Sequence, residues 1–180
     1  MRVIRENNVI SWTDNNNKIS IELKDVYYAR YFPTKDVIIA KTRTKIKDIS
    51  YYYYTIDGTL LLEYHLETGD IKWQTDNQLH KIKVNNLVSV ELDRNNNLLC
   101  VISGRNSRKI TILASDGNKL VDKPSPLGYK LVYISDVEIN KVKVVCDATI
   151  EENVDPYGRD RFNFSLDLTT GNWQKLGLAY

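Results

Sequence analysis

The chain has 180 residues, which is enough to bury a sizeable core, and its length predicts one domain rather than several. Its 25 basic and 23 acidic residues give a net charge of +2 and are mixed along the sequence, which argues against a nucleic-acid partner. With 42% hydrophobic and 27% charged residues, the composition favours neither disorder nor insertion into a membrane.

No segment has the features of a targeting signal or a membrane helix. The first residues carry Arg2, Arg5 and Glu6 and lack the apolar run of a secretory signal. The longest apolar runs, such as residues 37–40 and 98–102, are far shorter than the ~20 residues that a membrane helix needs. We therefore expect a cytoplasmic protein without a membrane partner. The abundance of Asn, Lys, Leu, Ile and Tyr is typical of AT-rich coding and indicates a bacterial or phage-like gene.

The two cysteines, Cys100 and Cys146, each lie inside an apolar strand pattern. Free cysteines behave as small hydrophobic residues, and disulfides are rare in reducing compartments. We expect two buried thiols.

Turn and strand signals alternate along the first part of the chain. Residues 9–12 and 19–23 flank an Asn-rich turn and predict a hairpin over residues 8–24. A four-stranded unit is expected over about residues 26–80, with turns at Lys35-Asp36 and Asp57-Gly58. An additional turn at residues 67–70, followed by residues 71–73, is interpreted as an insertion in this unit.

The second unit, over residues 84–123, is the most regular. Its first two strands flank an Asn-rich turn at residues 93–97. Ile110 and Ile112 then share one face of a strand, because side chains alternate with period two. The Asp116-Gly117 turn leads into the closing strand.

A third unit is predicted over residues 129–177, after the Pro- and Gly-containing segment 124–128. Its turns lie at Asn140 and at Thr170-Gly171, and residues 151–161 interrupt its strand pattern. No stretch shows the apolar spacing of a helix. We therefore expect an all-β protein of fourteen strands over residues 1–180, a single domain made of one hairpin and three antiparallel four-stranded meander repeats.

The order of turns in these units resembles the blades of β-propellers of the Trp-Asp repeat and quinoprotein kinds. The resemblance is carried by residues 95–97 with Asp116-Gly117, by Lys35-Asp36 with Asp57-Gly58, and by Asn140 with Thr170-Gly171. It implies a small or incomplete β-propeller-like fold. Two alternatives stay open: two chains that pair as a homodimer to close one propeller, and a β-sandwich or barrel.

The sequence contains no motif for metal, cofactor or catalytic chemistry. His65 and His80 have no second ligand at metal-binding spacing, and CxxC is absent. No serine lies in a GxSxG elbow, and the eight glycines form no phosphate-binding loop. We expect no metal, no cofactor and no enzymatic activity.

Residues 151–161 are the first candidate for a partner-binding site. Loops that are longer than their connection requires are more often functional than the strands they join. A mixture of charge with an exposed aromatic ring suits a protein interface better than a small-molecule pocket. The candidate residues are Asp155, Tyr157, Arg159, Asp160 and Arg161.

The second candidate is the run of four tyrosines at residues 51–54. In a strand, Tyr52 and Tyr54 share the face opposite to Tyr51 and Tyr53. One pair is expected to point outward, where tyrosine rings bind protein partners or stack on sugars. Tyr52 and Tyr54 are the candidate partner-binding residues.

These observations favour a non-enzymatic protein-binding protein. A small cytoplasmic β-protein with a bacterial signature and no catalytic motif fits an immunity protein that neutralises a cognate toxin. The alternative is a carbohydrate-binding or scaffold module of β-propeller-like fold. An unrecognised hydrolase ranks third.

Overall fold

The computed structural model describes residues 1–46, 48–75, 78–93, 95 and 97–179. The chain divides into two compact units, Met1–Val84 and Asn85–Tyr180. Each unit is described by itself, and the single domain expected from the sequence stays a prediction. Of the Asn-rich turn at residues 93–97, residues 94 and 96 lie outside the described part of the chain.

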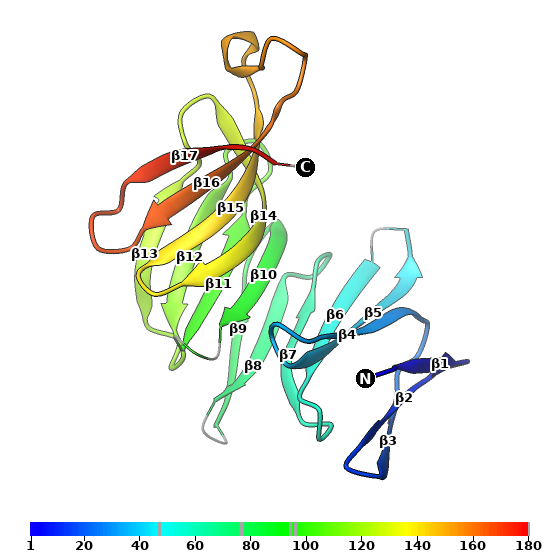
Figure 1. Ribbon diagram of the computed structural model, residues 1–180. Helices are drawn as coiled ribbons and strands as arrows, with labels where there is room; N and C mark the ends of the chain where they lie inside the picture. Colours follow the sequence, from blue (N-terminus) through cyan, green and yellow to red (C-terminus); the bar gives the residue numbers. More distant parts are fainter. Residues whose placement is uncertain (47, 76–77, 94, 96, 180) are drawn as a thin grey trace. The chain divides into compact units, whose positions relative to one another are not determined.

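The first unit contains two antiparallel sheets, drawn in blue to green in Figure 1. The three-stranded sheet consists of β1 (Ile4–Glu6), β2 (Val9–Asp14) and β3 (Asn17–Glu22). The six-stranded sheet consists of β4 (Val26–Phe32), β5 (Val37–Lys45), β6 (Asp48–Tyr54), β7 (Leu60–His65), β8 (Asp70–Thr75) and β9 (Gln78–Lys83).

The second unit contains two four-stranded antiparallel sheets. The first sheet consists of β10 (Leu87–Asp93), β11 (Leu98–Ser103), β12 (Lys109–Ala114) and β13 (Lys119–Pro124). The second consists of β14 (Tyr129–Glu138), β15 (Lys141–Ala148), β16 (Arg161–Asp167) and β17 (Trp173–Leu178), with the 3₁₀ turn η1 (Glu151–Asn153) between β15 and β16.

In every sheet, strands that follow each other in the chain are also neighbours in space, which is the meander order. The prediction of an all-β, propeller-like fold built from antiparallel meanders is therefore confirmed. Each sheet has two different edge strands, so the described strands form open sheets and no closed barrel. None of the described residues forms a helix long and apolar enough to cross a membrane.

The described part of the chain contains seventeen strands, where the sequence predicted fourteen. The N-terminal hairpin gains β1, because Asn7 adopts a left-handed φ of 53° and turns the chain back onto β2. The six-stranded sheet gains β8 and β9. Residues 67–73 are thus no insertion: Ile71 and Trp73 are buried and pair within the sheet.

A repeated backbone feature explains why the meander sheets share a similar spacing of turns. The residue just before the first strand has a left-handed φ in three sheets: Asp25, Asn86 and Gly128. The carbonyl of each accepts a hydrogen bond from a main-chain amide near the end of the second strand. The donors are Arg43 for Asp25 (3.1 Å), Gly104 for Asn86 (3.0 Å) and Thr149 for Gly128 (2.9 Å). Asp36, Asn97 and Asn140 take the same conformation before the second strand. Only Gly, Asn and Asp adopt this conformation at low cost. The recurrence of these residue types in the sequence therefore marks the repeat.

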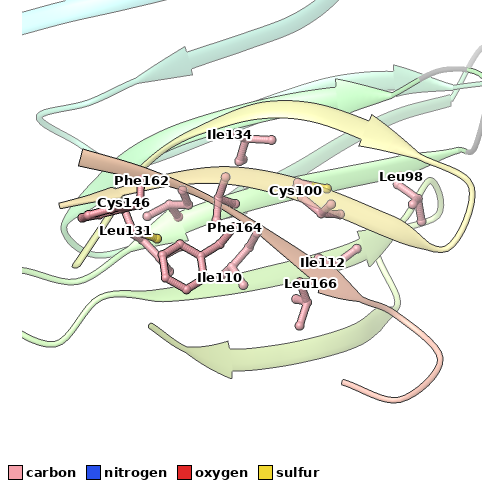
Figure 2. Close-up of a cluster of buried hydrophobic side chains, with 13 residues drawn as sticks. Leu98, Cys100, Ile110, Ile112, Leu131, Ile134, Cys146, Phe162, Phe164 and Leu166 are labelled. Atoms are coloured by element: carbon pink, nitrogen blue, oxygen red, sulfur yellow. The ribbon is translucent and has the colours of Figure 1, made fainter. Parts of the chain in front are cut away.

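The core of the second unit lies between its two sheets (Figure 2). Side chains at alternate positions of β11, β12, β15 and β16 face one another, as period two requires. Both cysteines lie in this cluster as free, buried thiols, which confirms the prediction. Burial raises the pKa of both, and that of Cys146 to about 12. The buried members are Leu98, Cys100, Ile102, Ile110, Ile112, Leu131, Ile134, Val142, Val144, Cys146, Phe162, Phe164 and Leu166.

In the first unit the three-stranded sheet packs on one face of the six-stranded sheet. Ile10 and Trp12 of β2 lie against Ile38 of β5 and Tyr54 of β6. The indole Nε1 of Trp12 donates a 2.6 Å hydrogen bond to the carbonyl of Ile56. The N-terminal sheet therefore covers the face of β6 that carries Tyr54.

Candidate functional site

The 151–161 loop connects β15 to β16 and extends beyond the end of their sheet, in orange in Figure 1. It begins with η1, and the side-chain amide of Asn153 donates a 3.1 Å hydrogen bond to the carbonyl of Gly128. The main-chain amide of Thr149 donates to the same carbonyl at 2.9 Å. The base of the loop is therefore tied to the segment that precedes β14.

Three of the predicted residues form one cluster at the tip of the loop. Asp155 Oδ1 accepts hydrogen bonds from the main-chain amides of Tyr157 (2.9 Å) and Arg159 (2.8 Å), and its Oδ2 accepts one from Arg159 Nε (2.6 Å). The Arg159 guanidinium lies over the Tyr157 ring, 5.1 Å from its centroid. The Asp155 side chain is 12% exposed, whereas Tyr157 is 84% exposed. Asp155 thus orders the loop and Tyr157 points into solvent.

Electrostatics keep this cluster charged. The Arg159 side chain, which donates to the carboxylate, lowers the pKa of Asp155 below its ordinary value, and the two main-chain amides add to the effect. An ionised carboxylate can accept all three hydrogen bonds at once. The tip therefore presents an exposed aromatic ring with a guanidinium over it.

The other two predicted loop residues act at the base of the loop. Arg161 Nε donates to Asp147 Oδ1 at 2.8 Å across the β15–β16 pair. The main-chain carbonyl of Asp160 accepts a 2.6 Å hydrogen bond from the Ala148 amide. Both residues close the loop and neither belongs to the tip cluster.

Two exposed apolar side chains next to the loop were not predicted from the sequence. Leu127 is 97% exposed and Ile150 is 48% exposed. Each is the chain neighbour of a residue in one hydrogen bond, because the Gly128 carbonyl accepts from the Thr149 amide. In the sequence, the Pro- and Gly-containing segment 124–128 was interpreted only as a boundary between repeats, so it did not indicate an exposed apolar residue at Leu127.

The structure corrects the expectation that Tyr54 points outward. Tyr54 is 5% exposed, and its ring lies 6.4 Å from that of Trp12. Tyr52 is half-buried and meets the His65 ring edge-on at 6.3 Å. The face that carries both is the one that the N-terminal sheet covers. Tyr54 is therefore a core residue and offers no ring to a partner, and the partner-binding role of Tyr52 stays a prediction.

A row of polar side chains crosses the same sheet, and sequence reasoning missed it. Ser50 Oγ lies 2.5 Å from His65 Nδ1, and His65 Nε2 lies 2.8 Å from Glu63 Oε1. Lys72 Nζ donates to Glu63 Oε2 at 3.1 Å. Ser50 is directly opposite His65 in the β6–β7 register, and Glu63 is opposite Lys72 in the β7–β8 register. Only the register brings these residues together.

The row contains an ionised carboxylate in a partly buried place. Burial alone would raise the pKa of Glu63, but the hydrogen bonds from His65 and Lys72 outweigh it, and the pKa lies below its ordinary value. Ser50 is 5% exposed, and the side chains of Glu63 and His65 are 15% and 25% exposed. The arrangement is a serine, an imidazole and a carboxylate in hydrogen-bonded sequence.

Two other features concern possible ligands. Among the described residues, no group of three or more His, Cys, Asp or Glu side chains could hold a metal ion. The absence of a metal or cofactor stays a prediction. A hollow of about 460 Å³ lies beside β2, where Met1, Ser11, Trp12 and Thr13 are among the residues that line it.

The fold and the site together define an all-β protein of propeller-like meander sheets that presents one ordered loop to solvent. No protein-family model matches the sequence, and no curated protein matches it. The Trp-Asp or quinoprotein type of repeat therefore stays a prediction, as does the homodimer.

Among solved structures, the chain is similar to the N-terminal domain of Nup159, with 13% identity and a TM-score of 0.49 over 97% of this chain and 57% of that one. It is also similar to a chain in an S. cerevisiae complex in which Dbp5 is bound to Nup159 (12% identity, TM-score 0.48, 97% of this chain and 60% of that one). A third similarity is to the β-propeller domain of the Trilobed protease from Pyrococcus furiosus, with 13% identity and a TM-score of 0.44 over 96% of this chain and 49% of that one. The chain thus spans about half to three fifths of these structures.

Proposed function

We propose that this chain is a protein-binding protein and that the tip of the 151–161 loop is its contact surface. The observation that carries the proposal is the cluster of Asp155, Tyr157 and Arg159. Tyrosine and arginine are the residue types that most often dominate binding energy at protein interfaces. Before binding, Asp155 already orders the main chain at Tyr157 and Arg159 and holds the Arg159 guanidinium. Preorganisation lowers the entropy that association costs.

The exposed apolar side chains beside the tip support the same proposal. Leu127 and Ile150 extend the apolar area that a partner would cover, and the charged groups around them would form a polar rim. An exposed apolar patch rimmed by polar groups is typical of interaction surfaces. The loop extends beyond the end of its sheet (Figure 1), which suits contact with a partner better than capture of a small molecule.

The carbohydrate-binding alternative has less support. Tyr51 is already stacked on Tyr64, with ring centroids 4.5 Å apart and planes 8° from parallel. Tyr54 is buried. Rings that are engaged within the protein offer no open platform on which a sugar could stack.

The proposal is tested by immobilising the chain and measuring binding of protein from cells of the native host. Tyr157→Ala combined with Arg159→Ala is expected to weaken binding of the specific partner at least ~30-fold, because each is placed as an anchor. Ile139→Ala is the matched control: Ile139 is 76% exposed and lies in the turn between β14 and β15, at the other end of β15. Equal affinities of the double variant and the control would contradict the proposal.

The finer proposal is that the partner is a toxin and that the chain is its immunity protein. It rests on the gene type that the composition indicates. Co-expression with the product of a neighbouring gene provides the test. Growth that is rescued by the wild-type chain and not by the Tyr157→Ala/Arg159→Ala variant would support it, while a partner that is harmless to cells would contradict it.

A further inference from the structure

The row on the six-stranded sheet has the connectivity of an activated nucleophile. A nucleophile within hydrogen-bond reach of a base, which is itself held by a third group, is the recurring arrangement for serine reactivity. Ser50, His65 and Glu63 satisfy it with distances of 2.5 and 2.8 Å. In the more familiar arrangement the serine contacts Nε2 and the acid contacts Nδ1. Here the two nitrogens are exchanged, but either nitrogen of an imidazole can accept a proton while the other donates.

The surroundings favour proton transfer from the serine to the imidazole. The lowered pKa of Glu63 keeps its carboxylate ionised, and Lys72 holds the second carboxylate oxygen at 3.1 Å. An ionised carboxylate on one ring nitrogen stabilises the imidazolium that forms when the other nitrogen takes a proton. The rings of Tyr52 and His65 lie perpendicular to each other, with centroids 6.3 Å apart. Ser50 and Glu63 therefore hold the imidazole by its two ring nitrogens.

We infer that Ser50 is a nucleophile that accepts an acyl or phosphonyl group from a small activated electrophile. In the step, Ser50 Oγ attacks the electrophilic carbon or phosphorus and forms the new bond. The leaving group departs with the electron pair of the bond that breaks, as fluoride in the case of a phosphonofluoridate. The hydroxyl proton passes to His65 and from there to water. The inference concerns one transfer to the protein and is independent of partner binding by the loop.

The chain provides its own control serine. It has two histidines: His65 contacts Ser50 and Glu63, while His80 bonds to Thr75 and stacks on Trp73. Ser11 has a similar exposure, 9% against 5% for Ser50, and borders the hollow beside β2. Ser11 is thus at least as accessible but has no imidazole to activate it.

The experiment is to incubate the folded full chain with a short alkyl phosphonofluoridate and to locate the modified serine by tandem mass spectrometry. Ser50 is expected to react at least ~100-fold faster than Ser11, the usual scale of general-base assistance. Ser50→Ala should remove the label, and His65→Gln and Glu63→Gln should slow it, each with a near-UV circular dichroism spectrum that shows an intact fold.

Equal labelling of Ser50 and Ser11, no labelling of Ser50, or labelling that His65→Gln leaves unchanged would each overturn the inference.

Discussion

Two connections in the second unit occupy the same place in their sheets and differ in length and use. Residues 104–108 join β11 to β12, and residues 149–160 join β15 to β16. Both begin with the same hydrogen bond, from Gly104 to the Asn86 carbonyl in one and from Thr149 to the Gly128 carbonyl in the other. The short connection shows that five residues are enough to make this turn.

The two connections direct their side chains differently. In the short one, Arg105 Nε donates to the Asn86 side chain at 2.7 Å, and the Arg108 guanidinium donates to the Leu131 carbonyl. Its arginines therefore bind within the unit. In the long one, Asp155 binds its own loop and leaves Tyr157 84% exposed. The added residues are used to order an exposed surface, and this is the reason that we place function there.

Gly104→Ala is expected to have the largest effect, because the short turn has no room for a side chain. Gly104 has a φ of 107°, and an added Cβ would collide with the main-chain oxygen of Ser107. We expect a loss of about 3 kcal/mol in the free energy of unfolding, measured by urea denaturation.

Gly158→Ala is the matched control in the long loop. Gly158 also has a left-handed φ, of 79°, but an added Cβ would meet no atom within 4 Å. Only the backbone strain, about 1 kcal/mol, is expected. If both substitutions lower the free energy of unfolding equally, the proposed steric difference between the two connections is contradicted.

Asp155→Ala is expected to have a smaller, local effect. The amides of Tyr157 and Arg159 lose their acceptor, and their hydrogen exchange should become ~10-fold faster, as expected for partly exposed bonds to a charged group. The free energy of unfolding should fall by no more than about 1 kcal/mol, because these hydrogen bonds are partly exposed and the loop is not part of the core. Asp160→Ala is the control, since Asp160 contributes its main-chain carbonyl to the loop base. Unchanged exchange of both amides in Asp155→Ala would show that the loop is ordered by other contacts.

The sequence predicted the fold well where backbone conformation restricts the residue type. Asp36, Asn97, Asn140 and the turn glycines were read as turns, and those with a left-handed φ mark the repeat. The Thr-Gly turn at Gly69 shows the limit of this signal. Its amide donates to the residue four positions earlier, as in the closing turn at Gly171, whereas Gly58 and Gly117 donate three positions back. Both kinds of turn join paired strands, so a Thr-Gly turn is as much a signal of the sheet as an Asp-Gly turn.

The sites were less predictable because they depend on which elements face one another. The alternation of side chains correctly placed Tyr52 and Tyr54 on one face, but only packing decides which face is covered, and Trp12 covers Tyr54. Likewise, Ser50 and His65 are fifteen residues apart in the sequence and meet through strand register alone. The loop was found because its excess length over a repeat is visible in the sequence itself.

The smallest expected effect is a pH dependence that separates the two connections further. The hydrogen bond from the Arg159 side chain lowers the pKa of Asp155 in the folded loop. Because the folded value is depressed, the stabilisation of the loop is fully present above the unfolded value of about 3.9 and is lost as the pH falls through the lower, folded value. The chemical shift of the Tyr157 amide should therefore titrate with a midpoint below about 3.9. The Gly104 amide, which donates to a carbonyl, should show no such step while the β15 amides report an intact sheet. Asp155→Asn should abolish the transition, and a midpoint at or above 3.9 would mean that the carboxylate does not hold the loop.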